Sequence, residues 1–201
     1  MAFTSYAELQ ASVANWLNRS DLTSEIVDFI ALAEADMNLA LVENKMETTA
    51  TVAVVDGLGP LPADCLDIIS VIMPNGAVLN PETDREADKF RSSGTAEAVT
   101  VSGTSLRIVP PGEGSYNVTL RYRQKVPALS DSNTSNWVLV DHFNAYLFGA
   151  LAHGESFLVN DEKEQEYRSK FAIALNGIAG RDIQRMVHGA QMTSAAGVSI
   201  G

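Results

Sequence analysis

The sequence predicts an α+β fold in which a bundle of four main helices, formed by the N- and C-terminal regions, carries an inserted antiparallel β module and an extended C-terminal arm. Apolar residues recur at spacings of three and four in both flanks, which indicates helices, and alternate in the centre, which indicates strands. The links between the expected strands are too short for parallel crossovers. We therefore expect a helical hairpin in residues 1–45, the β module in 46–128, a second helical pair in 129–188 and the arm in 189–201.

The N-terminal flank should form two helices. Ser5 and Glu8 have the spacing of a capping box, in which each side chain accepts a hydrogen bond from the other residue's backbone N–H, and this places the first helix at residues 5–17. A polar turn then leads to a second helix over residues 23–41. Because the turn is short, we expect the two helices to form an antiparallel hairpin.

The C-terminal flank should form two more helices after a polar loop at residues 130–136. An apolar stripe that includes Val140 and ends at Leu158 marks the third helix, where Gly149 and Gly154 would allow a neighbouring helix to approach closely. The fourth helix should begin near Asp161 and fade at residues 187–189. The remaining residues are small and uncharged, so they cannot form a core by themselves.

The central region should contain six strands and one short polar helix on the surface, over residues 81–90. The pairs Asp56-Gly57 and Gly59-Pro60 are typical of turns, and we expect them to stop the first strand. The expected strands cover residues 49–55, 66–73, 77–79, 98–101, 106–109 and 116–122.

Composition excludes several classes of protein. The single cysteine, Cys65, can form neither an internal disulfide nor a cysteine-based zinc site, and it suits synthesis in a cytosol. No apolar run approaches the roughly 20 residues that span a bilayer, and the N-terminus lacks a signal-peptide pattern, so we expect no membrane partner. The net charge of −11 argues against a protein that wraps DNA or RNA, because neutralising phosphates requires clustered Lys and Arg.

The sequence predicts no catalytic, cofactor or metal site. His142 and His153 lie eleven residues apart, about 16 Å along a helix, which is too far for one metal ion, so we interpret them as surface histidines. His153-Gly-Glu155 matches half of a zinc deaminase signature, but the chain lacks the cysteine half. We expect Cys65 to be a small buried residue, since no neighbouring base can be assigned to it.

One strand carries a row of bases. Arg121, Arg123 and Lys125 alternate with other residues and should project from one face, with Arg107 of another strand as a candidate neighbour. This face has three interpretations: a patch for phosphate or an acidic partner, a solvated strand face, or a basic strand against the acidic helical flank of the same chain or of a neighbouring copy. We favour the third, because residues 1–60 hold nine acids and two bases, a net charge of −7.

Six short blocks, in this order, resemble the head-to-tail adaptor proteins of tailed bacteriophages, which are also called connector or head-completion proteins. Together they thread almost the whole chain, and none is a catalytic motif. The blocks are YAEL at residues 6–9, WLNRSDL at 16–22, IVDFIALAEA at 26–35, LPAD at 61–64, VPALSDSNTSNW at 126–137 and YLFGAL at 146–151.

The resemblance implies a structural virion protein at the head-tail junction, synthesised in the host cytoplasm. Such proteins form a ring, commonly of twelve copies, between the portal protein and a tail or nozzle protein, and genomic DNA passes through the ring without sequence-specific binding. It also implies that the C-terminal segment engages the portal. From the acidic surplus of residues 1–60 we separately expect Arg121, Arg123 and Lys125 to contact other subunits or the tail. The expected portal-binding residues are Gly189, Gln191, Met192, Val198 and Ile200.

Two alternatives remain. A monomeric, tail-associated binding module, for instance for carbohydrate, would place aromatic residues on an exposed sheet face; Tyr116, Tyr122 and Trp137 are the candidates, although the strand pattern buries some of them. A small enzyme of unknown substrate would need perturbed ionisable groups clustered in a cleft, and the sequence suggests no such cluster.

Overall fold

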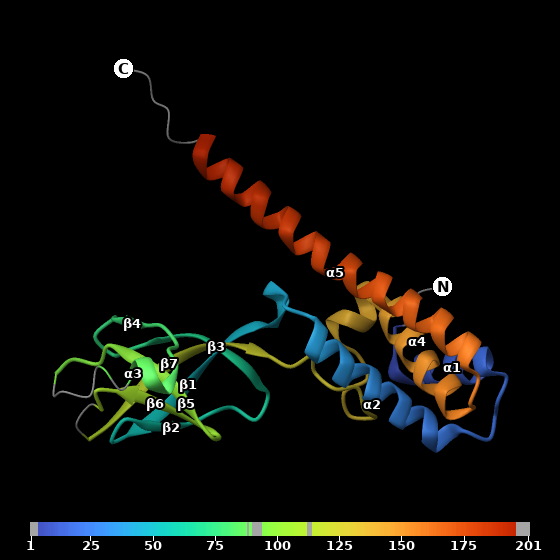
Figure 1. The fold of residues 1–201 in the computed structure, drawn as a ribbon, viewed down its shortest axis with the longest axis horizontal. Helices are drawn as coiled ribbons and strands as arrows, with labels where there is room; N and C mark the ends of the chain where they lie inside the picture. The colour runs from blue at the N-terminus through green and yellow to red at the C-terminus, as the bar shows by residue number, and fades with distance from the viewer. Residues whose placement is uncertain (1–3, 88, 90–93, 112–113, 196–201) are drawn as a thin grey trace. The chain divides into compact units, whose positions relative to one another are not determined.

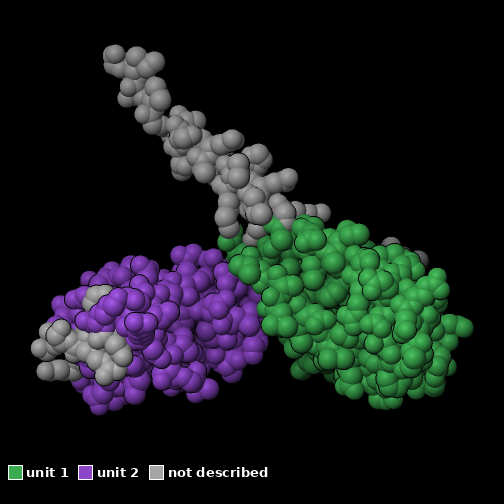
Figure 2. All heavy atoms as spheres, in the orientation of Figure 1, with its two compact units in different colours: residues 1–44, 126–201 green, residues 45–125 purple. Residues whose placement is uncertain are grey.

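A computed structural model describes residues 4–87, 89, 94–111 and 114–195, and for residues 180–195 it describes the backbone alone. The chain divides into two units (Figures 1 and 2). The first, which we call the helical unit, comprises residues 1–44 and 126–201; the second, the β module, comprises residues 45–125. The predicted α+β class is therefore confirmed, with helices from both flanks and an antiparallel sheet from the centre.

The first helix starts as its cap predicts. The Ser5 side chain accepts a hydrogen bond from the Glu8 backbone N–H at 3.3 Å, and the Glu8 carboxylate reaches back to the backbone N–H of Thr4 at 2.7 Å. The return bond thus goes one residue further than an ordinary capping box, to Thr4 in place of Ser5. The helices of the helical unit are α1 (Tyr6–Leu17), α2 (Thr23–Ala40), α4 (Trp137–Phe157) and α5 (Asp161–Ala195).

Helix α4 bends near its start. Asn136 caps it by accepting a hydrogen bond from the Leu139 N–H at 2.9 Å, but His142 has non-helical angles, φ −142° and ψ 44°. This break shifts the first turn out of phase with the rest of the helix. Val138 and Leu139 are buried there, whereas Val140 is 55% exposed, so the prediction that Val140 belongs to the buried stripe is wrong.

Helix α4 packs against α1, α2 and α5. Two of its glycines permit this, as the sequence predicts. A Cβ atom on Gly149 would lie 2.8 Å from the Ala33 Cβ of α2, and one on Gly154 would lie 2.9 Å from a Leu17 methyl of α1. The glycine backbone therefore brings these helices closer than any side chain would allow. The arrangement of the helices as a regular four-helix bundle stays a prediction.

Helix α5 continues beyond the expected end. It has 35 residues and includes positions 187–195, where the sequence predicted fading and then an extended arm. That prediction is wrong for residues 189–195. Ala190, Gln191 and Met192 favour helices strongly, and one interior glycine, Gly189, costs only about 1 kcal/mol. Of the expected portal-binding residues, Gly189, Gln191 and Met192 therefore lie in α5, and Val198 and Ile200 lie outside the described residues.

The β module forms a seven-stranded antiparallel sheet in the order β4-β3-β7-β1-β2-β6-β5. Short helical segments also occur: η1 (Asn44–Met46) and α3 (Asp84–Ala87). The expected polar helix at 81–90 is thus shorter, with residues 88 and 90 outside the described part. The strands are β1 (Glu47–Val55), β2 (Leu58–Pro60), β3 (Cys65–Ile72), β4 (Val78–Leu79), β5 (Ala98–Ser102), β6 (Ser105–Val109) and β7 (Ser115–Gln124).

The sheet nearly closes on itself. Beyond β4 the chain runs parallel to β5, where Pro81 bridges to Val99 and the Glu82 N–H donates to the Val99 carbonyl at 2.8 Å. A sheet curled in this way encloses an apolar interior. The buried residues of that interior are Val52, Val54, Val71, Leu79, Val99, Leu106, Ile108, Val118, Leu120 and Tyr122.

The sequence missed strand β2. Asp56 and Gly57 do form a turn, with φ values of 48° and 79°, but Gly59 lies inside the next strand, not in a stop signal. A Cβ on Gly59 would lie 2.8 Å from a Val52 methyl, so glycine is needed there for close packing. Glycine is therefore needed for two different reasons: Gly57 allows the positive φ of the turn, and Gly59 allows close packing within β2.

Candidate functional site

The histidines of α4 do not form a metal site. Among the residues that the structure describes, no group of three or more His, Cys, Asp or Glu side chains is placed to hold a metal ion. His153 lies 2.9 Å from Asp36 of α2 and is largely covered, so its interpretation as a surface histidine is wrong. The ring of His142 meets the Trp137 ring edge-on, with centroids 6.3 Å apart. Both histidines thus contact side chains of the helical unit.

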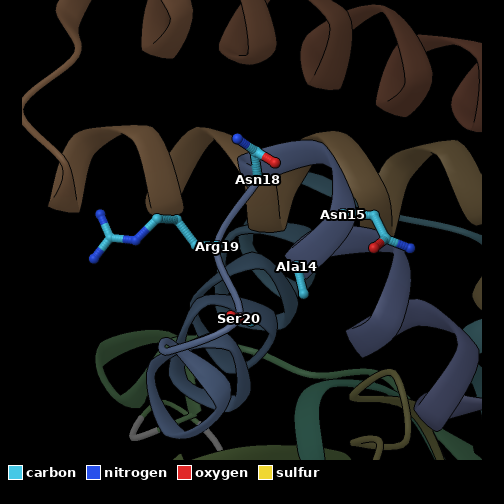
Figure 3. A pocket seen from close by; sticks show the side chains of 5 residues that line it. All are labelled: Ala14, Asn15, Asn18, Arg19 and Ser20. Atoms are coloured by element: carbon cyan, nitrogen blue, oxygen red, sulfur yellow. The ribbon is translucent and has the colours of Figure 1, made fainter.

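A polar hollow of about 210 Å³ lies at the turn between α1 and α2 (Figure 3). It is lined by Ala14, Asn15, Asn18, Arg19 and Ser20. In the figure the side chains of Asn15, Asn18 and Arg19 point in different directions and do not converge on a common centre. The Arg19 guanidinium already forms two hydrogen bonds to the Asp21 carboxylate, at 2.7 and 2.8 Å. This hollow is best explained as the surface of a capped turn.

Cys65 lacks the environment of a nucleophile. Burial raises the pKa of its thiol, and the negative charges of Asp64 and Asp67 raise it further. A higher pKa means less thiolate at neutral pH, and the thiolate is the reactive form. Cys65 packs, partly exposed, against the interior of the β module.

The three predicted bases on β7 lie together, and each has a partner inside the β module. Arg121 contacts Glu47 of β1 at 2.5 Å, and Arg123 contacts Asp67 of β3 at 2.8 Å. Lys125 donates to the carbonyl oxygen of Ala63 at 3.4 Å. We call Arg121, Arg123 and Lys125 the basic strand face. Within the chain its partners come from β1, from β3 and from the turn before β3, not from the acidic helical flank.

Arg107 does not belong to the basic strand face. It lies on β6, which β1 and β2 separate from β7 in the sheet, and its guanidinium is 3.8 Å from the Asp84 carboxylate of α3. The structure also gives no support for the aromatic face that the alternative binding module would need. Tyr122 is buried and donates to Asp64 at 3.2 Å, and Trp137 belongs to the other unit. The structure therefore offers no support for a carbohydrate-binding sheet face.

Sequence reasoning missed a buried polar network in the helical unit. The Tyr146 hydroxyl and the Leu129 N–H both donate to one oxygen of Glu34, at 2.9 and 2.8 Å. Asn136 donates from its amide to the Tyr146 hydroxyl at 2.5 Å and to the Pro127 carbonyl at 2.7 Å. A signal was present, because Glu34 stands four residues after Ile30, on the apolar stripe of α2. The network holds the segment that returns from the β module against α2 and α4.

Large apolar side chains remain exposed on the helical unit. Leu39 of α2 is 86% exposed, and Val159, between α4 and α5, is 83% exposed. Val159 also has a φ of 56°, which β-branched residues rarely adopt. Apolar exposure of this kind is typical of surfaces that other proteins cover. The other members are Trp16, Val27, Leu32, Val42, Val140, Phe157 and Ile173.

Large exposed apolar side chains on the helical unit are typical of a protein that binds other proteins through its surface. A comparison with models of protein families identifies the family. The model for the SU10 adaptor protein matches residues 4–195, and the chain belongs to this family. It is a structural adaptor protein of bacteriophage and a component of the virion. No curated protein matches the chain. In the described part, no helix combines the length and apolar character needed to cross a bilayer.

Proposed function

We propose that this protein is a head-to-tail adaptor that assembles as a ring of twelve copies between the portal and the tail, with the genome passing through the ring. The observation that carries the proposal is the family match over residues 4–195, which spans both units. A two-unit chain suits such a position, because each unit can contact a different ring.

The charge of the chain supports a DNA channel. The net charge is −11, and residues 1–60 alone contribute −7, from nine acids and two bases. A channel lined with carboxylates repels the phosphates of DNA, so the genome would slide without adhering. The low content of bases also agrees with DNA passage that involves no sequence-specific binding.

Three surfaces would make the protein contacts. The exposed apolar residues of the helical unit would pack between neighbouring copies. The segment that contains Gly189, Gln191, Met192, Val198 and Ile200 would engage the portal. The basic strand face would contact a neighbouring subunit or the tail protein. Exposed ion pairs contribute only about 0–1 kcal/mol each, so its bases can exchange Glu47 and Asp67 for carboxylates of a partner at little cost.

The test is assembly on purified portal rings, followed by native mass spectrometry and electron microscopy. We expect the protein alone to form weak rings or none, and to form stable rings of one mass when portal rings are present. Isolated protein that forms stable twelve-membered rings at micromolar concentration would contradict this order of assembly. Failure to bind portal rings of its own phage would contradict the proposed position.

A further inference from the structure

In the described part of the β module, the near-closed sheet has an open seam between strands β3 and β5. A groove of about 570 Å³ follows this seam. Leu61, Cys65 and Ile68 form much of its floor, and they pack against the module's apolar interior while staying partly exposed. Pro81 and Val101 line the opposite side. The groove therefore exposes the margin of the interior instead of a separate surface hollow.

Backbone groups along the seam lack strand partners among the described pairings. Strand β4 pairs with β3 at Val71 and Ile72, so residues 66–70 have no neighbouring strand on that side. Pairing with β4 stops there because β4 has only two residues. On its other side β3 pairs with β7, and two register shifts in that ladder, between Cys65 and Asp67 and between Ile68 and Ser70, bend the strand. An exposed strand edge beside an apolar floor is the arrangement that binds an added strand.

We propose that this groove, which we call the β3–β5 groove, binds residues 196–201 of a second copy of the chain as an added strand along β3. The segment reads Ala-Gly-Val-Ser-Ile-Gly and follows α5 directly. Its six residues reach about 20 Å when extended, which matches the open edge at 66–70. Val198 and Ile200 would face the apolar floor, and Ser199 would face solvent. The segment has no charged side chain, so none would be buried without a partner.

The inference rests on one part of the proposed function, namely that several copies of the chain come together. Because the same segment belongs to the proposed portal-binding arm, the β3–β5 groove would hold it in protein that has not reached a portal. Portal binding would then draw the segment out of the groove. This exchange would let copies associate loosely before assembly without completing a ring.

Cys65 makes the groove directly testable, because it is the single cysteine of the chain and lies on the floor. A synthetic peptide of residues 194–201, blocked at both ends, is added to protein truncated after Ala195, and the rate of Cys65 alkylation is followed. We expect the peptide to slow alkylation at least severalfold. A peptide with Val198→Asp and Ile200→Asp should leave the rate unchanged. Equal rates with both peptides would overturn the proposal.

A cross-link identifies the donor copy. In the full chain, Ile200→Cys should form a disulfide with Cys65 of a second copy and give a covalent dimer, whereas Ser199→Cys should not. Val101→Asp, in the groove, should abolish the cross-link, and Val55→Asp, at a similar exposure outside the groove, should preserve it. A cross-link only within one chain, or none, would overturn binding by a second copy. Neither assay contains portal, so either can fail while assembly on portal rings succeeds.

Discussion

The hydroxyl of Tyr146 on α4 donates a hydrogen bond of 2.9 Å to a carboxylate oxygen of Glu34 on α2, where both side chains are buried. That oxygen also accepts from the Leu129 N–H, so three distant parts of the helical unit meet at one acceptor. Burying a carboxylate is expensive unless donors surround it. The bond therefore matters for the stability of the helical unit and for holding the segment around Leu129.

Tyr146→Phe should destabilise the helical unit by about 1–3 kcal/mol, because it leaves a buried carboxylate with one donor fewer and removes the hydroxyl that Asn136 contacts. Urea unfolding followed by circular dichroism measures this change. Tyr167→Phe is the control, since Tyr167 is also buried but lies outside the network. Equal losses in the two variants would show that the network contributes nothing beyond ring packing.

The buried carboxylate should also make stability depend on pH. Burial raises the pKa of Glu34 above its ordinary value of 4.5, although the bonds from Leu129 and Tyr146 oppose the rise. The folded state thus retains the proton to higher pH than the unfolded state does. The protonated Glu34 side chain therefore favours the folded state fully below pH 4.5. This contribution to the free energy of unfolding should decrease as pH rises from 4.5 through the raised pKa of Glu34, and it is lost above that pKa.

Glu34→Gln removes this titration while keeping an acceptor oxygen for both donors. The free energy of unfolding of wild type, relative to that of Glu34→Gln, should therefore decrease as pH rises above 4.5. Urea unfolding of both proteins across this range measures the difference. Glu162→Gln, at an exposed position, controls for the change in net charge. A difference that stays constant with pH would contradict the assignment.

Two glycines should respond oppositely to alanine. Gly149→Ala should destabilise the protein by about 1–3 kcal/mol, because the new Cβ would lie 2.8 Å from that of Ala33. Gly177→Ala should stabilise it by up to about 1 kcal/mol, because its Cβ would meet nothing within 4 Å and alanine favours α5. Thermal unfolding distinguishes the two. Destabilisation by both would mean that Gly177 is more closely packed than the structure shows.

Local signals predicted much of the fold. The Ser5 cap, the alternation of β7 and the glycines of α4 all depend on residues close in sequence, so their patterns can be read directly. The misses depend on distant contacts. The strand around Gly59 packs closely against Val52 of β1, and no local pattern marks the kink at His142. The closure at Pro81 and Val99 joins two edges that no local pattern relates.

The candidate surfaces show the same division. Spacing placed Arg121, Arg123 and Lys125 on one strand face, but it could not reveal that Glu47, 74 residues from Arg121, is a partner. The buried role of Glu34 requires Leu129 and Tyr146, which are 95 and 112 residues away in sequence. Such pairs follow from the fold as a whole.

The basic strand face should be needed for assembly more than for folding. Reversing Arg121, Arg123 and Lys125 to Glu should impair ring formation on portal rings or tail attachment, because partner carboxylates would then be repelled. Reversal of Arg19, Arg168 and Lys170 on the helical unit, which makes the same change in net charge, is the matched control. Circular dichroism checks the fold of both variants. Intact assembly with altered DNA retention would favour DNA contact instead.

A charge swap separates the two roles of Arg121. The double variant Arg121→Glu with Glu47→Arg keeps an ion pair between β1 and β7 but reverses the charges offered to a partner. If Arg121 only stabilises the β module, the swap should restore assembly to the wild-type level. If it contacts another protein, the swap should restore stability and leave assembly impaired, which is the result we expect.

The segment that follows the described side chains of α5 should anchor the protein to the portal. Deletion after His188 removes the last seven residues of α5 and everything beyond them. The truncated protein should stay folded, because the buried side chains of α5 that the structure describes, Tyr167, Phe171, Ala174 and Ile178, all precede the deletion. It should nevertheless fail to bind portal rings. Repetition of the segment around a ring would multiply a weak contact, so its loss should be severe.

Deletion after Ala195 is the matched variant, since it retains the whole of α5 and removes Val198 and Ile200. Pull-down on portal rings should rank the wild type first, this shorter deletion second and the deletion after His188 last, because Gly189, Gln191 and Met192 contribute from the helix. Ordering an extended segment costs about 1–2 kcal/mol per residue in backbone entropy, whereas residues already helical avoid much of that cost. Wild-type affinity after the longer deletion would place the portal contact elsewhere, and the exposed aliphatic residues of α2 would be the next surface to mutate.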